Sequence, residues 1–477
     1  ELTYAGLAEQ VNRVGNALRG LGVRMEERVL LVLLDTVRFP AVFFGAIKVG
    51  AVPVPVNTLL TAKDYDDLLR DTRARVLVVS APIFDRIAAI LPGQPFLERV
   101  IIDGPAAGDA LALAALLADA SPELEAAPTL ADDFAFWLYT SGSTGQLKGA
   151  VHLQSDLVYT AEYYGTSVLG IREDDVVFSA AKLFFAYGLG NSMTFPLRVG
   201  ATAVLMAERP TPAAVRRRLV EKRPTIFYGV PTLYASLLAE PGELASSALR
   251  VCTSAGEALP KDVGDRFSAR TGVDILDGIG STEMLHIFVS NRPGDVRYGT
   301  TGTAVPGYEV EIRDEAGAPV APGGVGDLWV SGPSSAAFYW NKREQSRATF
   351  HGRWTRTGDH YLCDAEGRYV YQGRSDDMLK VGGIYVSPFE VEAALVAHRA
   401  VLEAAVVGHA DENGLIKPRA IVVLTDPALA SDTLVGELKA HVKATLAPYK
   451  YPRWVEIVAE LPKTATGKIQ RFKLRRP

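Results

Sequence analysis

The sequence predicts an α/β fold: a large N-terminal region of stacked βαβ sheets with a β subdomain, followed by a smaller α+β C-terminal domain. Short apolar runs alternate with helical patterns through the first three-quarters of the chain, and this rhythm changes near Tyr308. Runs that are apolar at nearly every position are typical of parallel strands whose two faces are covered by helices. The chain's 477 residues are enough for more than one domain.

Local signals place the elements of the N-terminal region. Thr61 and Asp64 have the spacing of a capping box, and Pro212 and Pro231 stand where the first turn of a helix would begin. The Ala-rich segment 105–128 is expected to be a helix-bearing connection on the surface. Strands are expected at the apolar runs 29–34, 76–80, 134–139, 176–180, 202–205, 225–228, 251–254 and 273–276.

The C-terminal part has a different pattern. From about Tyr308, short strands and glycine-rich turns predict the β subdomain. We place the domain boundary in the turn 373–377, which divides the chain into residues 1–375 and 376–477. The elements expected in the second domain are a helix capped by Ser387, strands at 404–407 and 420–424, and a helix over 433–446.

Composition excludes several classes of protein. A net charge of −5 and a pI of about 5.9 argue against nucleic acid or an anionic membrane as the main partner. The two cysteines, Cys252 and Cys363, form no metal or disulfide pattern, which favours a reducing, cytoplasmic location. The most apolar stretch, 29–56, is interrupted by charges and prolines, so a buried strand and helix are expected rather than a membrane span. No signal peptide is evident, although Glu1 resembles a start within a longer protein.

The strongest local signal is the segment Tyr139-Thr-Ser-Gly-Ser-Thr-Gly-Gln-Leu-Lys-Gly-Ala-Val151. Its glycines let backbone N–H groups approach an anion, while its hydroxyls and lysine add donors and charge, which is what binding a polyphosphate requires. It is neither a Walker A loop nor a GxGxxG fingerprint. A flexible linker is the alternative, and the buried aromatic strand before it disfavours that reading. The expected phosphate ligands are Thr140, Ser141, Gly142, Ser143, Thr144, Gly145 and Lys148.

This segment resembles the phosphate loop of the adenylate-forming superfamily of acyl-CoA synthetases, peptide-synthetase adenylation domains and firefly luciferase. Further motifs follow in the family's order as far as Arg471, so the resemblance covers essentially the whole chain. About 40 residues that the family usually carries before Glu1 are absent. The resemblance implies a ligase that uses ATP, Mg²⁺ and coenzyme A, and forms an acyl-adenylate before a thioester.

Two motifs resemble the family's nucleotide site. The turn Ser254, Ala255, Gly256 and Glu257 would read the adenine edge through backbone groups. In the motif Asp277, Gly278, Ile279, Gly280, Ser281, Thr282 and Glu283, Thr282 would donate to a phosphate and Glu283 would hold Mg²⁺. Many relatives have an aromatic residue in place of Ile279, so adenine stacking would be weaker here or supplied elsewhere. The alternative for Glu283 is an acid favoured by a helix dipole.

The remaining motifs concern ribose, the hinge and catalysis. By resemblance Asp359 would accept hydrogen bonds from the ribose hydroxyls, and Arg374 would add a nucleotide contact. The small C-terminal domain would be mobile about the hinge residue Asp376. Lys468 would bridge the carboxylate and the α-phosphate during adenylation; the alternative is a solvated basic tail. Gly382 and Gly383 would line the tunnel for the pantetheine arm of CoA, although a tight turn also explains glycine there.

The acyl pocket resembles that of benzoate-CoA ligases. Its bulky, aromatic residues imply a short, flat cavity for an aromatic carboxylate, most closely benzoate, and not for a long fatty chain. Core packing is the alternative for the aromatic side chains, and a lone histidine is usually structural. The expected acid and intermediate contacts are Phe185, Ala186, Tyr187, Gly280, Ser281, His286, Ile287 and Lys380.

Other functions stay open at this point. The enzyme alternatives are a ligase for 4-hydroxybenzoate, 2-aminobenzoate or another small aryl acid, an adenylation domain that loads a carrier protein, and a luciferase-like oxygenase. A nucleotide-binding regulator without catalysis is disfavoured because Lys468 and Glu283 are both present. The expected partners are the aryl acid, ATP and CoA, without nucleic acid or membrane, and a homodimer is an assembly that the resemblance allows.

Overall fold

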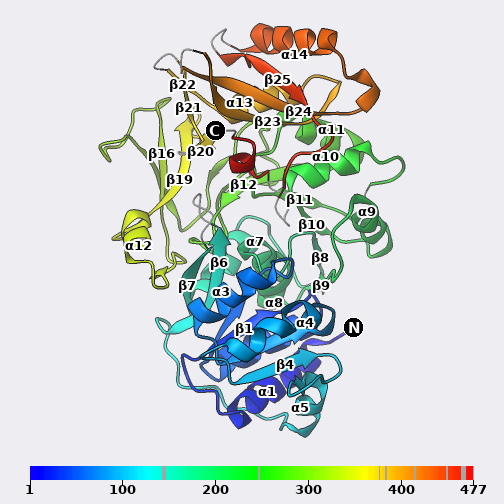
Figure 1. Cartoon of the computed structure of the whole chain (residues 1–477), viewed down its shortest axis with the longest axis vertical. Helices are drawn as coiled ribbons and strands as arrows, with labels where there is room; N and C mark the ends of the chain where they lie inside the picture. The colour runs from blue at the N-terminus through cyan, green and yellow to red at the C-terminus, as the bar shows by residue number, and fades with distance from the viewer. Residues whose placement is uncertain are drawn as a thin grey trace.

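The computed structural model describes residues 1–141, 147–244, 248–374, 377–381, 384–412, 415–446, 450–463 and 469–475. In Figure 1 the N-terminal elements lie at one end of the long axis and the C-terminal sheet with α14 at the other, with the strands β8 to β12 between them. The expected fold class is confirmed: parallel sheets covered by helices precede a β subdomain and an α+β unit.

The first sheet is entirely parallel, in the order β2-β1-β3-β4-β5. Alternate residues of β1 enter different cores: Leu31 packs with the helices α1, α2 and α5, whereas Leu30 packs with α3 and α4. Both faces are therefore covered, as the apolar runs predicted. The strands are β1 (Arg28–Val32), β2 (Val52–Pro55), β3 (Val76–Ser80), β4 (Arg99–Asp103) and β5 (Leu111–Ala112). The helices are α1 (Tyr4–Gly20), α2 (Arg38–Lys48), α3 (Ala62–Thr72), α4 (Ala81–Ile87), η1 (Ala88–Gly93) and α5 (Leu113–Asp119).

The second sheet has the order β14-β13-β12-β11-β10-β8-β9, parallel from β9 to β12 and antiparallel beyond it. Its strands are β8 (Val176–Ser179), β9 (Thr202–Val204), β10 (Ile226–Gly229), β11 (Val251–Ser254), β12 (Ile275–Gly280), β13 (Ile287–Ser290) and β14 (Thr303–Ala304). The helices α9 (Pro212–Glu221), α10 (Pro231–Ala239) and α11 (Lys261–Thr271) cover one face. The other face packs on η2 (Ala161–Thr166), α7 (Ala186–Leu189) and α8 (Phe195–Val199), or on the β subdomain. The short α6 (Asp156–Thr160) precedes η2, and η3 (Gly190–Thr194) joins α7 to α8.

The strand expected at 134–139 differs from the βαβ pattern. It extends as β6 (Phe134–Ser141) and pairs antiparallel with β7 (Leu147–Leu153), which pairs in turn with β17 (Phe338–Tyr339). The physical reason is the length of the connection, because so few residues join β6 to β7 that only a hairpin can form. The described residues of the phosphate-loop segment, 139–141 and 147–151, thus lie on two paired strands.

The strands and helices expected in the β subdomain and in the C-terminal part are present, while the domain boundary between residues 375 and 376 stays a prediction. The subdomain has the order β15-β16-β19-β18, with β20 on β19, and the C-terminal unit contains the sheet β23-β24-β25. The subdomain elements are β15 (Glu309–Arg313), β16 (Val325–Ser331), α12 (Arg343–Thr349), β18 (Phe350–His351), β19 (Trp354–Cys363) and β20 (Tyr369–Arg374). The later elements are β21 (Leu379–Val381), β22 (Ile384–Val386), α13 (Pro388–Val396), β23 (Val401–Ala410), β24 (Ile416–Leu424), η4 (Pro427–Leu429), α14 (Asp432–Thr445), β25 (Trp454–Ile457) and η6 (Arg471–Lys473).

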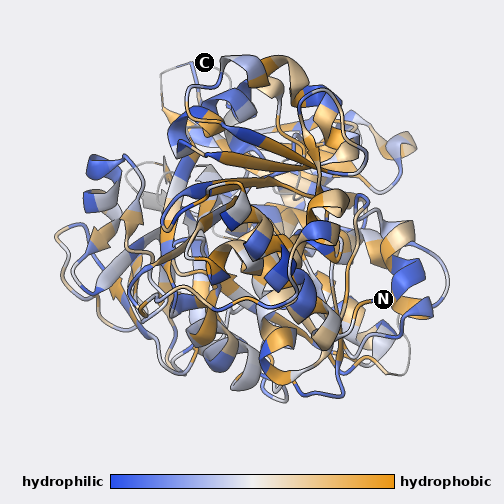
Figure 2. Cartoon of the chain, turned by 90° about the horizontal axis from the view of Figure 1, so that it is seen from below, coloured by the Kyte–Doolittle hydropathy of each residue, from blue (hydrophilic) through white to orange (hydrophobic). Residues whose placement is uncertain are grey.

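Most local signals are confirmed. Thr61 and Asp64 form a reciprocal capping box, Pro212 and Pro231 begin their helices, and Ser387 caps α13. Figure 2 shows the strands largely in the hydrophobic colour, which agrees with sheets buried between layers. Across the described ranges, no helix is long and apolar enough to cross a bilayer.

Candidate active site

The base of the β6–β7 hairpin positions the phosphate-loop segment. Thr140 stands opposite Lys148 in the antiparallel register, and Ser141 stands opposite Leu147. Below them the Tyr139 hydroxyl donates to Asp71 Oδ2 at 2.5 Å, which ties the hairpin to α3. The predicted ligands Gly142, Ser143, Thr144 and Gly145 lie outside the described residues, so their role stays a prediction. What the structure describes is the pair of strands on either side of them, tied to α3.

Tyr339 links the hairpin to the predicted metal ligand. Lys148 Nζ lies 5.0 Å from the centroid of the Tyr339 ring, and the Tyr339 hydroxyl donates to Glu283 Oε1 at 2.5 Å. Burial, followed by the nearby Glu283 carboxylate, raises the pKa of Tyr339, so this hydroxyl keeps its proton and acts as a donor. Lys148, Tyr339 and Glu283 therefore contact one another in series.

A second link is buried completely. His152 Nε2 lies 2.8 Å from the carbonyl oxygen of Thr282, which can only accept, so Nε2 carries a proton. His152 Nδ1 lies 2.8 Å from Asp156 Oδ2, and both side chains have no exposed surface. The strand that leaves the phosphate-loop segment is thus joined to the backbone of Thr282, immediately before Glu283. Ser281 contributes to the same turn by accepting from the N–H of Met284 at 3.2 Å.

The last parallel pair of residues on β11 and β12 presents polar atoms that lack partners among the described residues. Ser254 and Asp277 are paired in the parallel register, and both are buried. Among the described residues, Ser254 Oγ and Asp277 Oδ1 have no hydrogen-bond partner. Burial raises the pKa of Asp277 well above its usual range, although the N–H groups of Leu259 and Gly278 oppose this shift. Buried polar atoms normally have partners, so this place suits a polar ligand edge such as that of a purine.

The turn after β11 also meets the C-terminal segment. Gly256 adopts a φ of +93°, which glycine tolerates, and a Cβ there would meet nothing within 4 Å. The next residue, Glu257, accepts a hydrogen bond from the backbone N–H of Ile469 at 2.9 Å. Ala255 is buried between them and β11. The predicted adenine turn is therefore in contact with the residue that follows Lys468.

Asp359 and Arg374 face each other across β19 and β20, as direct partners in the antiparallel register. Arg374 Nη1 lies 3.2 Å from Asp359 Oδ1 and donates to the carbonyl oxygen of Thr357 at 3.2 Å. Asp359 is 9% exposed, so its carboxylate is fixed in place. The predicted ribose contact and the predicted second nucleotide contact are therefore brought together.

The predicted acyl residues surround the start of α7 and the β12–β13 hairpin. The Tyr187 hydroxyl and Thr253 Oγ1 are 2.5 Å apart, which joins the acyl segment to the strand carrying Ser254. His286 Nε2 lies 3.1 Å from Asn191 Oδ1, and burial lowers the pKa of His286 to about 3, so its imidazole is neutral. Aromatic rings pack around it, those of Tyr164, Tyr187 and Phe195.

Glycine is required in this hairpin by close contact. A Cβ at Gly280 would lie 2.5 Å from the carbonyl oxygen of His286, and one at Gly278 would lie 3.0 Å from the Ile287 side chain. Ala186 and Ile287 are buried and Phe185 is partly exposed. The predicted acyl residues therefore gather in one region, with Ile279 packed on its border.

The segment before α7 is held by an unexpected buried pair. Asp35, after β1, accepts from the N–H of Leu183 at 3.3 and 3.2 Å, and its Oδ2 lies 4.0 Å from Lys182 Nζ. Burial raises the pKa of Asp35 to about 7 against the attraction of Lys182. Phe184 and Phe185 follow directly, with ring centroids 4.5 Å apart. The first sheet thereby positions the acyl segment.

Several predictions fall where the structure gives no description. Asp376, Gly382, Gly383 and Lys468 lie outside the described residues, and the side chain of Lys380 does too. Conversely, sequence reasoning did not select Tyr339, His152, Asp156 or Asp35. Only His152 and Asp156 carried a local signal, as a His and an Asp four residues apart directly after the phosphate-loop strand. Nothing in the sequence near Tyr339 or Asp35 indicates what they contact.

Comparison with family models gives a direct assignment. The model described as "AMP-binding enzyme" matches residues 1–340, and the one described as "AMP-binding enzyme C-terminal domain" matches residues 390–468. The chain belongs to the AMP-binding enzyme family. This membership, together with 63% identity to a benzoate–CoA ligase along nearly the whole chain, makes it an AMP-forming acid–CoA ligase that uses ATP, Mg²⁺ and CoA.

Among AMP-binding enzymes the chain is similar to aryl-CoA ligases. It is 63% identical to the benzoate–CoA ligase of Thauera aromatica, over 99% of this chain and 90% of that protein. It is 50% identical to the 4-hydroxybenzoate–CoA/benzoate–CoA ligase of Rhodopseudomonas palustris, over 99% and 88%. Among solved structures, a benzoate CoA ligase from Burkholderia xenovorans LB400 aligns with a TM-score of 0.93 at 56% identity, over 99% of this chain and 94% of that one.

Proposed function

We propose that this protein is an ATP-dependent ligase that converts benzoate to benzoyl-CoA through benzoyl-adenylate, releasing pyrophosphate and then AMP. The observation that carries the proposal is the 63% identity with a benzoate–CoA ligase along nearly the whole chain. The grouping of the predicted acyl residues beside the strands that carry Ser254 and Asp277 supports it. That arrangement would bring an aryl carboxylate and an adenine-bearing nucleotide into one region.

In the first step the enzyme must bind the charged phosphates of ATP and align the carboxylate of the acid with the α-phosphorus. The ATP polyphosphate would lie at the tip of the β6–β7 hairpin beside Lys148, and the adenine amino group would donate to the unpartnered oxygen of Asp277. The ribose hydroxyls would donate to Asp359. Lys468 would approach the reacting oxygens, where a positioned ammonium stabilises the developing charge. The benzoate oxygen attacks the α-phosphorus, and pyrophosphate leaves.

The residues present fit a magnesium ion bound mainly by nucleotide. Glu283 uses Oε1 to accept from Tyr339, which leaves Oε2 for an ion. Throughout the described part of the chain there is no group of three or more His, Cys, Asp or Glu side chains able to hold a metal. One carboxylate with phosphate oxygens and water is a usual Mg²⁺ environment. The ion would neutralise phosphate charge, while Glu283 and Tyr339 would fix its place.

The second step would use the same aryl-adenylate. We propose that the C-terminal domain, residues 376–477, turns about Asp376, which withdraws Lys468 and brings Gly382 and Gly383 to the entry of the CoA thiol. The thiolate attacks the carbonyl carbon of the mixed anhydride, and AMP leaves with the electron pair of the broken C–O bond. No protein nucleophile is needed, because ATP has already supplied the leaving group. Positioning and charge stabilisation provide the catalysis.

A second candidate is a ligase for 4-hydroxybenzoate, and a specific observation favours it. The Rhodopseudomonas palustris relative is named for both 4-hydroxybenzoate and benzoate. The buried His286 ring has an unprotonated Nδ1 without a partner among the described residues, so it could accept from a hydroxyl. A 2-aminobenzoate ligase and an adenylation domain that loads a carrier protein are alternatives of the same class.

A panel of acids tests the proposal. Pyrophosphate release is measured with benzoate, 4-hydroxybenzoate, 2-aminobenzoate and a long-chain fatty acid, each with and without CoA. We expect benzoate to give the highest kcat/KM and benzoyl-CoA to accumulate only when CoA is present. A higher kcat/KM with 4-hydroxybenzoate would select the second candidate, and an optimum on the fatty acid would overturn both. A homodimer and a cytoplasmic location stay predictions, to be checked by light scattering and by fractionation.

A further inference from the structure

One hydrogen bond joins the predicted nucleotide turn to the C-terminal part of the chain. Glu257 Oε1 accepts from the backbone N–H of Ile469 at 2.9 Å. The two residues are separated by 212 positions, and each lies next to a predicted functional element. Glu257 ends the adenine turn, and Ile469 directly follows Lys468.

Ile469 and Lys463 flank residues 464–468, which lie outside the described residues; we call 462–470 the Lys468 turn, because its two described ends are paired. Ile469 forms an isolated antiparallel bridge with Lys463, and the next residue, Gln470, donates its N–H to the carbonyl oxygen of Pro462 at 2.8 Å. These two contacts close the chain on either side of residues 464–468. The Glu257 carboxylate therefore accepts a hydrogen bond from one of the two paired ends of this turn.

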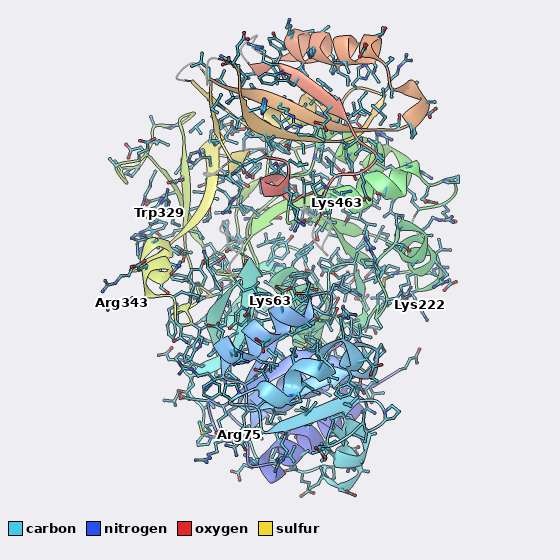
Figure 3. All side chains as sticks on the ribbon, viewed as in Figure 1. Lys63, Arg75, Lys222, Trp329, Arg343 and Lys463 are labelled. Carbon is cyan, nitrogen blue, oxygen red and sulfur yellow. The ribbon has the colours of Figure 1, made fainter. Side chains whose placement is uncertain are left out.

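The base of this turn is fixed to the C-terminal domain. The Ile469 side chain packs on a cluster containing Leu461 and Leu474. Arg471 forms a bidentate pair with the buried Glu392, at 3.1 and 2.6 Å, and so ties the following helix η6 to α13. In Figure 3 Lys463 lies near the middle of the molecule, between the C-terminal sheet and the N-terminal elements. Ile469 is thus packed with the C-terminal elements, whereas Glu257 follows β11 of the second sheet.

We propose that Glu257 is a positioning residue that docks the base of the Lys468 turn on the nucleotide site for adenylation, and that this contact must break before the CoA step. The inference rests on the proposed function, because it assigns Glu257 to only one of the two half-reactions. A carboxylate that accepts from a backbone N–H forms a charge-assisted bond, which is stronger than a neutral one. A single hydrogen bond of this kind can break when the C-terminal domain rotates and form again when it returns.

The consequence is a selective change in rate. Without the carboxylate the docked arrangement is less populated, so the first half-reaction slows at saturating ATP, by about tenfold for the loss of one charge-assisted hydrogen bond. The second half-reaction, started from benzoyl-adenylate and CoA, does not use the contact and keeps its rate or gains. A residue that only bound ATP would instead raise the KM for ATP and leave the saturating rate unchanged.

The experiment compares Glu257→Ala and Glu257→Gln with Glu403→Gln in the full-length enzyme. Glu403 pairs with Lys463 Nζ at 2.6 Å within the C-terminal domain, so its variant alters the same turn without touching the large domain. Three quantities are measured: single-turnover benzoyl-adenylate formation at saturating Mg·ATP, thioester formation from benzoyl-adenylate, and hydrogen exchange in the peptide that contains Ile469.

We expect Glu257→Ala to slow adenylation about tenfold, to preserve thioester formation and to speed exchange at Ile469. Glu257→Gln keeps an acceptor oxygen and should restore most of the adenylation rate, and Glu403→Gln should leave the ratio of the two half-reactions as in the wild type. An unchanged saturating rate with a raised KM for ATP would overturn the proposal, as would unchanged exchange at Ile469. If the wild type releases no pyrophosphate with any acid, the proposed function fails, while the exchange measurement still decides the docking contact.

Discussion

The Tyr339 hydroxyl donates to Glu283 Oε1 at 2.5 Å, across a separation of 56 residues. Tyr339 lies on β17, the third strand of the hairpin sheet, whereas Glu283 follows the end of β12. Lys148 Nζ approaches the ring of the same tyrosine. The phosphate-loop strand and the proposed magnesium ligand are therefore connected through one side chain that neither motif contains.

Replacement of Tyr339 by Phe removes this hydrogen bond and keeps the ring beside Lys148. A hydrogen bond to a charged acceptor contributes about 1.5–3 kcal/mol, so we expect the rate of pyrophosphate release to fall at least tenfold. The magnesium concentration that gives half the maximal rate should rise, because Glu283 is no longer oriented. Tyr369→Phe is the control, since that hydroxyl donates to the carbonyl of Val310 within the β subdomain. Equal magnesium dependence in the two variants would contradict the role given to Tyr339.

Lys468→Ala separates the two half-reactions. Loss of a positioned charge at the reacting oxygens costs about a hundredfold or more, so adenylate formation should fall by at least that factor. Thioester formation from supplied benzoyl-adenylate should change by no more than a few fold, because the lysine is withdrawn at that step. Lys463→Ala, which removes a pair with Glu403 in the same turn, serves as the control. If Lys468→Ala forms benzoyl-adenylate at the wild-type rate, the proposed mechanism is wrong.

Asp35 predicts a pH dependence of stability. Its pKa is raised from 3.8 to about 7 in the folded protein, so the folded state keeps a proton that the unfolded chain has lost. The resulting stabilisation is complete below about pH 4 and is lost as the pH rises through 7, by on the order of 4 kcal/mol. The side chain of the Asp35→Asn variant cannot ionise. The melting temperature of the variant minus that of the wild type should therefore increase from pH 5 to pH 8. The exposed Asp132→Asn should follow the wild type throughout, and parallel curves for both variants would refute the assignment.

Gly280→Ala tests the close approach within the β12–β13 hairpin. The new Cβ would lie 2.5 Å from the carbonyl oxygen of His286, and backbone atoms cannot move away as a flexible side chain could. We expect a loss of stability of about 1–3 kcal/mol, seen as a lower melting temperature, together with a raised KM for benzoate. Gly93→Ala is the matched control, because nothing lies within 4 Å of a Cβ there. Normal melting and a normal KM in Gly280→Ala would show that the hairpin is not tightly packed.

Much of the fold could be predicted because its signals are local. The capping box of Thr61 and Asp64, the proline that begins α10 and the serine cap of α13 each depend on neighbours within a few residues. The buried strands were also evident, since a strand covered on both faces must be apolar at every position. The antiparallel pairing of β6 was not anticipated, because an apolar run does not reveal the direction of its partner.

The candidate site was predictable only where its residues lie in compact motifs. Ser254, Asp277 and Asp359 each lie in a strand that its own motif helped to identify, and the structure brings Ser254 and Asp277 into register. Tyr339 and Asp35 could not be found in this way. Each acts through a contact with a residue far away in sequence. The residues next to them in the sequence are mostly apolar, as in any buried segment.

The sequence alone determined the alternation of strands and helices, the starts of individual helices and the small, polar composition of the phosphate loop, since these depend on the chemistry of adjacent residues. The tertiary structure decided which side chains support the motifs: Tyr339 on Glu283, His152 on the backbone of Thr282, and Asp35 on the acyl segment. The physical reason is that these hydrogen bonds form only after distant strands have packed, and packing is set by the whole core and not by any single segment.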